Sequence, residues 1–149
     1  MKQLTLIFLA VILAACSFTQ GTDFSRNRDK WQQAGITSYR YSLRLACFCA
    51  FSEQMPLTIE VRDGEPVSMT NSDGTTVALT DPYYEHFFRY GTMDRIFADL
   101  ETNLNGGADE VIVSYDATYG YPTQIDYDYI KDAIDDELYL TISDLEVLP

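Results

Sequence analysis

Apolar and polar residues alternate along three stretches in the first half of the chain. The clearest is 39–51, in which polar residues such as Arg40 separate apolar ones. A period of two is typical of a strand with one buried face. Two shorter alternating stretches, 57–61 and 67–69, flank Asp63-Gly64, which suits the positive φ of a tight hairpin. The apolar positions of the first stretch are Tyr39, Tyr41, Leu43, Leu45, Cys47, Cys49 and Phe51. These patterns predict a meander of three strands.

The second half of the chain has a similar arrangement. Stretches 111–115, 123–129 and 138–142 alternate in the same way, and the turn residues of 116–122 join the first two. An acidic segment, 132–136, breaks the pattern before the last stretch. We therefore expect a second group of three strands.

Two stretches have helical spacing instead. Phe24, Arg28 and Trp31 recur along one face of 23–34, and Gly35 is a natural stop, so we expect a short helix with Trp31 as its core anchor rather than a ligand-stacking residue. A second helix is expected after the capping residue Thr92, ending at Gly106-Gly107. Its apolar stripe is Met93, Ile96, Phe97, Leu100 and Leu104.

The predicted order is therefore α-β-β-β-α-β-β-β. Adjacent strands with a helix between the two groups favour an α+β fold, in which about two helices cover one face of an antiparallel sheet. The chain has 149 residues, of which 46% are hydrophobic and 13% aromatic, enough for one well-packed core. We expect a single globular domain over residues 23–149.

The N-terminal segment resembles a bacterial lipoprotein signal. Lys2 precedes an apolar run from Leu4 to Leu13, and Leu13-Ala14-Ala15-Cys16 resembles a lipobox. The run is shorter than the ~20 residues that span a bilayer. The resemblance implies a signal peptide over 1–15, cleavage before Cys16, and lipid on Cys16 as the link to the membrane.

After cleavage, residues 16–22 would form the lipidated cysteine and a short tether, which spans at most about 20 Å. Ser17 follows the cysteine where, in lipoprotein sorting of this kind, Asp favours inner-membrane retention. The expected location is the cell envelope, at the outer membrane facing the periplasm if the host is Gram-negative.

The charge of the chain excludes one class of partner. Its formal net charge is −13, and loss of Lys2 with the signal makes it −14. Such a chain repels phosphate backbones, so nucleic-acid binding is not expected, and docking by charge onto anionic lipid is disfavoured. Motifs of hydrolases, zinc proteases and phosphate-binding loops are absent from the sequence, and no cofactor is expected.

The pair Cys47 and Cys49, one residue apart, is the most distinctive local motif. An envelope protein lies in an oxidising compartment, so the oxidation state of the two thiols matters. Residues two apart in a regular strand lie about 6.6 Å apart at Cα, so a bond between them needs a bulge or a turn. A structural disulfide, a reducible pair active in thiol exchange, a thiolate metal site, and free thiols or bonds to a partner all remain open.

Two further groups of residues could bind a ligand. The aromatic segment before the second helix either forms a recognition surface or folds over the sheet; its candidate residues are Tyr83, Tyr84, His86, Phe87, Phe88 and Tyr90. An acidic group near 132–136 is either a solvated loop or a calcium site; its candidate ligands are Asp126, Asp128, Asp135, Asp136 and Glu137.

Several short motifs in register give the chain a resemblance to a known family. They are Trp31, Tyr39-Arg40-Tyr41, Cys47-Phe48-Cys49, Val61-Arg62-Asp63-Gly64, Met93 to Phe97, and Gly120-Tyr121-Pro122. With them the chain resembles the bacterial domain-of-unknown-function family DUF6174, whose members are mostly secreted or lipid-anchored. The resemblance implies no activity and supplies no functional residue.

The leading hypothesis is a non-catalytic, lipid-anchored envelope module that binds a protein or a small molecule near residues 83–90. The alternatives are a thiol-active envelope protein that uses Cys47 and Cys49, and a calcium-binding envelope protein.

Overall fold

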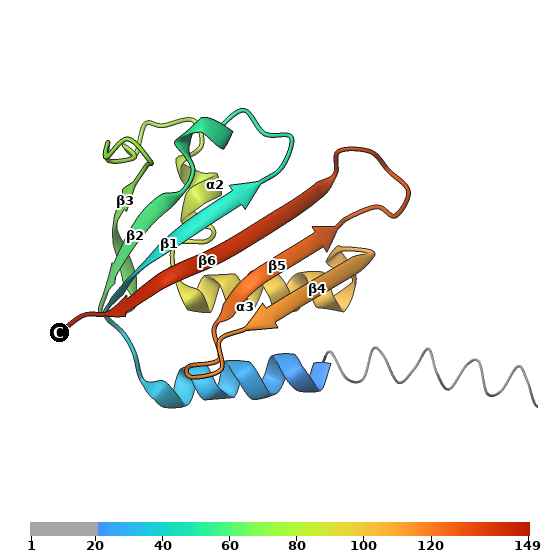
Figure 1. Cartoon of the computed structure of the whole chain (residues 1–149), viewed down its shortest axis with the longest axis horizontal. Coiled ribbons are helices and arrows are strands. Elements are labelled where there is room, and N and C mark those ends of the chain that lie inside the picture. Colours follow the sequence, from blue (N-terminus) through green and yellow to red (C-terminus); the bar gives the residue numbers. More distant parts are fainter. Residues whose placement is uncertain (1–20) are drawn as a thin grey trace, which may run out of the picture.

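The computed structural model describes residues 21–149. They form a six-stranded antiparallel sheet with helices packed against one face, which confirms the expected α+β class (Figure 1). The predicted signal peptide, Cys16 and most of the tether lie outside the described residues.

A first helix is described over residues 21–34, and the other elements follow in chain order. The first group is β1 (Tyr39–Ala46), a short 3-10 helix (Ser52–Gln54), β2 (Leu57–Arg62), β3 (Glu65–Thr70), α2 (Tyr84–Phe88) and α3 (Met93–Thr102). The second is a π-type turn (Asn103–Gly107), β4 (Glu110–Tyr115), β5 (Pro122–Asp128) and β6 (Glu137–Val147).

The two predicted meanders join into one sheet through the last strand. The strand order is β3-β2-β1-β6-β5-β4, so β6 pairs with β1 on one side and with β5 on the other. Leu43, for example, lies opposite Ile142. The long β6 arrow crosses the middle of the sheet in Figure 1. A pairing between the two ends of the chain is a non-local contact that alternation alone does not specify.

The alternating residues point to the same side, as expected. Inward-facing side chains of β1, β2, β5 and β6 belong to one buried core with the apolar stripe of α3. Each fully buried aliphatic or aromatic side chain stabilises the fold by about 1.5–3 kcal/mol. The fully buried members of this core include Tyr41, Leu43, Ile59, Val61, Met93, Ile96, Leu100, Ile125 and Leu140.

Trp31 anchors the first helix in the core, as predicted. Its side chain is 4% exposed and makes edge-to-face contacts with Tyr39 at 5.3 Å and with Tyr121 at 6.3 Å between ring centroids. Gly120 has φ +81°, and a Cβ there would lie 2.5 Å from the carbonyl oxygen of Asn27. The Gly120-Tyr121-Pro122 motif thus fits the β4–β5 hairpin tightly against the first helix.

The elements differ from the sequence prediction in several places, of which three affect the site. β1 ends at Ala46 rather than Phe51, because the chain turns at the cysteine pair. Helix α2 was not predicted, since five residues are too few to show a period. Helix α3 ends at Thr102, and the apolar pattern that continues to Leu104 belongs to the π-type turn.

Candidate functional site

The aromatic segment that the sequence marked as one surface has two parts. Phe87 is fully buried and Tyr90 is 1% exposed, and Tyr90 accepts a hydrogen bond from the hydroxyl of Tyr41 through its carbonyl oxygen. Both residues therefore belong to the core, and the prediction that they contact a ligand at the surface was wrong. Burial was not readable from the segment, because its five-residue helix has no visible apolar face.

The half-buried part of the segment forms a stack. The rings of Tyr84 and Phe88 lie 5.5 Å apart and nearly parallel at 20°, and the guanidinium of Arg95 lies 3.8 Å from the centre of the Phe88 ring. Arg95 also donates a 2.9 Å hydrogen bond to the carbonyl oxygen of Phe88 and reaches Glu65 of β3 at 3.5 Å. The stack is thereby connected to the edge strand of the sheet.

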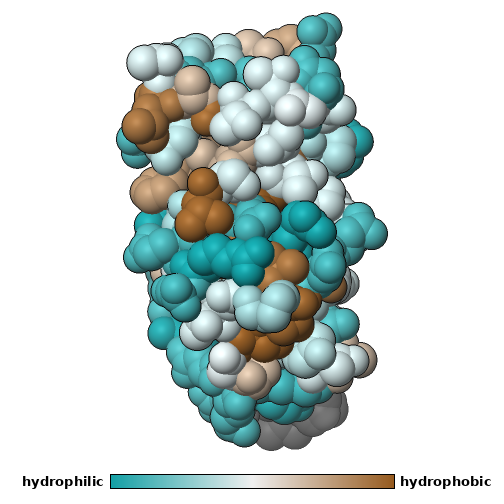
Figure 2. Space-filling view, turned by 90° about the vertical axis from the view of Figure 1, so that its left-hand side faces the viewer, coloured by the Kyte–Doolittle hydropathy of each residue, from teal (hydrophilic) through white to brown (hydrophobic). Residues whose placement is uncertain are grey.

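A small groove lies between this stack and β3. It has a volume of about 270 Å³. Val67 and Leu79 at its rim are 57% and 79% exposed, whereas Met69 and Val77 beneath them are 4% and 7% exposed. In Figure 2, apolar residues lie in separate groups on this side of the molecule. The groove is lined by Pro66, Val67, Ser68, Met69, Thr76, Val77, Leu79 and Tyr84. We call it the β3 groove.

Local features of the backbone shape the β3 groove. The register of β2 and β3 shifts between Glu60 and Val61, so Val67 is the extra residue of a bulge. The amide of Val77 donates a 2.8 Å hydrogen bond to the carbonyl oxygen of Met69, which covers that part of the edge. Gly91 lets α2 approach β3, since a Cβ there would lie 3.2 Å from Cγ of Pro66.

Tyr83 and His86 lie on the other side of α2 against Phe51. The Phe51 ring lies 5.5 Å from Tyr83 and 4.9 Å from His86. Burial, followed by repulsion from Arg89, lowers the pKa of His86, and its Nε2 atom has no hydrogen-bond partner among the described residues. This environment favours a neutral packing histidine.

A buried carboxylate beside α2 was missed at the sequence level. Asp99 is 6% exposed and forms an ion pair with Arg89 at the end of α2. Tyr127 of β5 donates a 2.8 Å hydrogen bond to Oδ2 of Asp99, and Asn103 donates to the same oxygen at 3.3 Å. Burial, followed by the charge of Asp99, raises the pKa of Tyr127. The available signal was its spacing, because Asp99 follows Ile96 by three residues and so lies next to the apolar stripe of α3.

Cys47 and Cys49 form a disulfide with a Cα–Cα distance of 5.1 Å. They lie just after β1, where the chain turns toward the 3-10 helix, and Phe48 between them is 88% exposed. Both cysteines are half-buried against the core. Of the possibilities left open by the sequence, the structure contains the local disulfide.

The predicted calcium ligands lie on the outer face of the sheet and in the loop that adjoins it. Asp126, Asp128 and Glu137 are on the outer face of the sheet, whereas Asp135 and Asp136 are in the β5–β6 loop. Loss of hydration and repulsion from several neighbouring carboxylates, including Asp136 and Glu137, raise the pKa of Asp128. Among the described residues, no three His, Cys, Asp or Glu side chains are grouped so that they could hold a metal ion. We therefore do not propose a calcium site.

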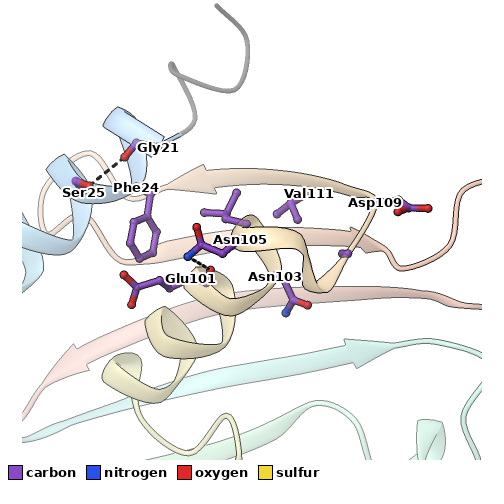
Figure 3. A pocket seen from close by; sticks show the side chains of 10 residues that line it. Gly21, Phe24, Ser25, Glu101, Asn103, Asn105, Asp109 and Val111 are labelled. Atoms are coloured by element: carbon purple, nitrogen blue, oxygen red, sulfur yellow. Dashed lines mark hydrogen bonds between the residues drawn. The ribbon is translucent and has the colours of Figure 1, made fainter. Parts of the chain in front are cut away.

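Another hollow, of about 420 Å³, borders the start of the described chain (Figure 3). Gly21 and Phe24 of the first helix lie on one side of it, and Asn103 and Asp109 near β4 lie on the other. The hollow therefore lies between the first described residues and the beginning of β4.

One of the comparisons with known proteins confirms the expected family. No helix within residues 21–149 has the length and apolar character needed to cross a bilayer. Searches of curated proteins and of solved structures found no match to the chain. Residues 23–147 match the Family of unknown function (DUF6174). This match covers most of the chain, which therefore belongs to the DUF6174 family.

Proposed function

We propose that this protein is a lipid-anchored, non-catalytic module of the cell envelope that binds a partner protein at the β3 groove. The anchor part of the proposal is supported by the order of Lys2, the apolar run and Leu13-Ala14-Ala15-Cys16. Acyl chains contribute about 0.8 kcal/mol per buried methylene, so several chains on Cys16 hold a protein at a membrane durably. Ser17 favours the outer membrane in a Gram-negative host.

The observation that carries the binding role is the exposure of Val67 and Leu79 at the rim of an apolar groove. Large apolar side chains grouped at one hollow mark an interaction surface more often than scattered ones do. The groove is lined by no histidine, cysteine, lysine or carboxylate among the described residues. Its lining suits contact rather than acid–base or thiol chemistry.

The size of the β3 groove favours a protein partner. Pockets for small molecules usually have about 300–1,000 Å³, and the groove, at about 270 Å³, lies below that range. It accommodates a few apolar side chains of another protein. Pro66 has no amide hydrogen and Val67 bulges, so contact through side chains is favoured over regular strand addition.

The net charge indicates the charge expected of the partner segment. A chain with formal charge −13 attracts cationic segments and repels acidic ones. The expected occupant is therefore an apolar segment of an envelope protein flanked by Lys or Arg.

Photo-crosslinking in the producing cells tests the groove. A benzoylphenylalanine residue replaces Leu79 in the full chain, and a second version carries it at Ile112 on the outer sheet face, where the native side chain is 55% exposed. We expect one dominant adduct from position 79 and none from position 112. The partner peptide in that adduct should contain apolar residues flanked by Lys or Arg.

The substitution Val67→Asp supplies the decisive comparison. It places a charge in the groove and should abolish the adduct, whereas Thr141→Asp, the same charge at an exposed strand position, should leave it intact. Both variants should keep the Tm of the parent. An adduct that survives Val67→Asp, or that joins an acidic partner segment, would contradict the proposed partner site.

A fractionation experiment tests the anchor separately. Labelled palmitate should be incorporated into the native chain and lost in Cys16→Ser, which should also leave the outer-membrane fraction. Incorporation that persists in the variant would rule out Cys16 as the lipidated residue.

A further inference from the structure

The β5–β6 loop exposes two large apolar side chains that nothing in the described structure covers. Ile130 is 62% exposed and Ile134 is 87% exposed. The loop is held in place at both ends. The amide of Ile130 donates to the carboxylate of Asp136, and the amide of Lys131 donates a 2.8 Å hydrogen bond to Asp109. The exposure therefore belongs to an ordered loop.

This loop lies at the same end of the molecule as the start of the described chain. Asp109, which accepts the hydrogen bond from Lys131, lines the same hollow as Gly21. Figure 3 shows Gly21 and Asp109 on two sides of that hollow. In Figure 1, the first helix begins toward the right, and the β5–β6 loop projects on that side too. The C-terminus and β3 lie at the opposite end.

The length of the tether restricts the orientation of the domain. Five residue steps separate Cys16 from Gly21. At about 3.3–3.6 Å per residue they span at most about 18 Å. A lipid on Cys16 therefore keeps the end that bears Gly21 within about 18 Å of the bilayer surface.

From this geometry, and on the basis of the lipid anchor proposed above, we infer that Ile130 and Ile134 contact the bilayer surface. The contact orients the domain, with the β5–β6 loop toward the lipid and the β3 groove away from it. Transfer of these two side chains out of water favours the contact, and the short tether makes it intramolecular.

The charge of the loop specifies the lipid. Asp132, Asp135 and Asp136 outnumber Lys131, so anionic headgroups repel the loop, whereas zwitterionic headgroups do not. The contact should be strongest on phosphatidylcholine or phosphatidylethanolamine surfaces and weaker on surfaces rich in phosphatidylglycerol.

Quenching of tryptophan fluorescence by doxyl-labelled lipid tests the inference on the full, lipidated chain. The probe is a phosphatidylcholine vesicle that contains the quencher. Ile134→Trp places a reporter in the loop, and Leu79→Trp places a matched one at an exposed site beside the β3 groove. The native Trp31, which is 4% exposed, contributes the same background to both.

We expect at least two-fold stronger quenching and a blue-shifted emission for Ile134→Trp, and weaker quenching when phosphatidylglycerol replaces half of the phosphatidylcholine. Equal quenching at positions 134 and 79, or none at either, in a lipidated protein that floats with the vesicles would overturn the inference. Failure of the anchor itself looks different, because the N-terminal peptide would lack the added lipid mass and the native chain would not float.

Discussion

The hydroxyl of Tyr127 donates a 2.8 Å hydrogen bond to Oδ2 of Asp99, joining β5 to α3 inside the core. Asp99 is also paired with Arg89, whose side chain is 53% exposed. A buried carboxylate is costly unless its oxygens are paired, so the position of α2 and α3 against the sheet depends on this arrangement.

The pair can be tested by a double-mutant cycle. Tyr127→Phe removes one hydrogen bond to a buried charge, and Asp99→Asn removes the charge, so each should lower the free energy of unfolding by about 1–3 kcal/mol. The combined variant should lose less than the total of the two single losses, because the residues share one interaction. Urea unfolding measures these values, and Asp94→Asn on the exposed side of α3 is the control. Additive losses would mean that the two residues act independently.

His86 should make stability depend on pH. It is the one histidine of the chain, and its pKa is lowered in the folded state from the ordinary value of 6.5. The unfolded chain therefore binds a proton more readily, so the contribution of His86 is fully present above pH 6.5 and is lost as the pH falls toward the folded pKa. Thermal unfolding from pH 7.5 to 5 should show a smaller decrease in Tm for His86→Phe than for the native chain. Parallel curves for the two proteins would refute this role.

The close approach at Gly120 gives a prediction with a matched control. Gly120→Ala combines the strain of φ +81° with a Cβ 2.5 Å from the carbonyl oxygen of Asn27, whereas Gly74→Ala, at φ +89°, meets nothing within 4 Å. A left-handed backbone costs a non-glycine residue about 1–2 kcal/mol, and displacement of the first helix adds to this at Gly120 alone. Denaturant unfolding should therefore rank Gly120→Ala below Gly74→Ala. Equal losses would place the whole effect in the backbone conformation.

The disulfide can be tested on protein taken from membranes. Acid-quenched thiol trapping and mass spectrometry should find the Cys47–Cys49 peptide uniformly oxidised within one chain and resistant to mild reductant, because structural disulfides generally have low reduction potentials. A mixed population, or a bond to another protein, would instead favour the thiol-active alternative.

Much of the fold could be predicted because its pattern is local. The alternation around Tyr41 and Leu43 identified a buried strand face, Asp63-Gly64 identified a hairpin, and the α3 stripe beginning at Met93 identified its buried side. Each of these signals lies within one element or one turn, so residues close together in the sequence are enough to show it.

The candidate sites were harder to predict than the fold, as the aromatic segment shows. Composition drew attention to residues 83–90, but only packing separated the buried Phe87 from Tyr84, which lines the β3 groove. The cysteine pair was visible from its spacing, whereas its bond depended on the turn that ends β1 at Ala46.

The sequence alone thus predicted most of the elements, the α+β class, the acidic charge and a lipid signal, since each is a property of neighbouring residues or of composition. Folding in three dimensions placed β6 between β1 and β5, brought Tyr127 to Asp99, and formed the groove between Val67 and Leu79. These contacts join residues far apart in the chain, and they depend on how side chains fill the space between the sheet and its helices, which no local period encodes.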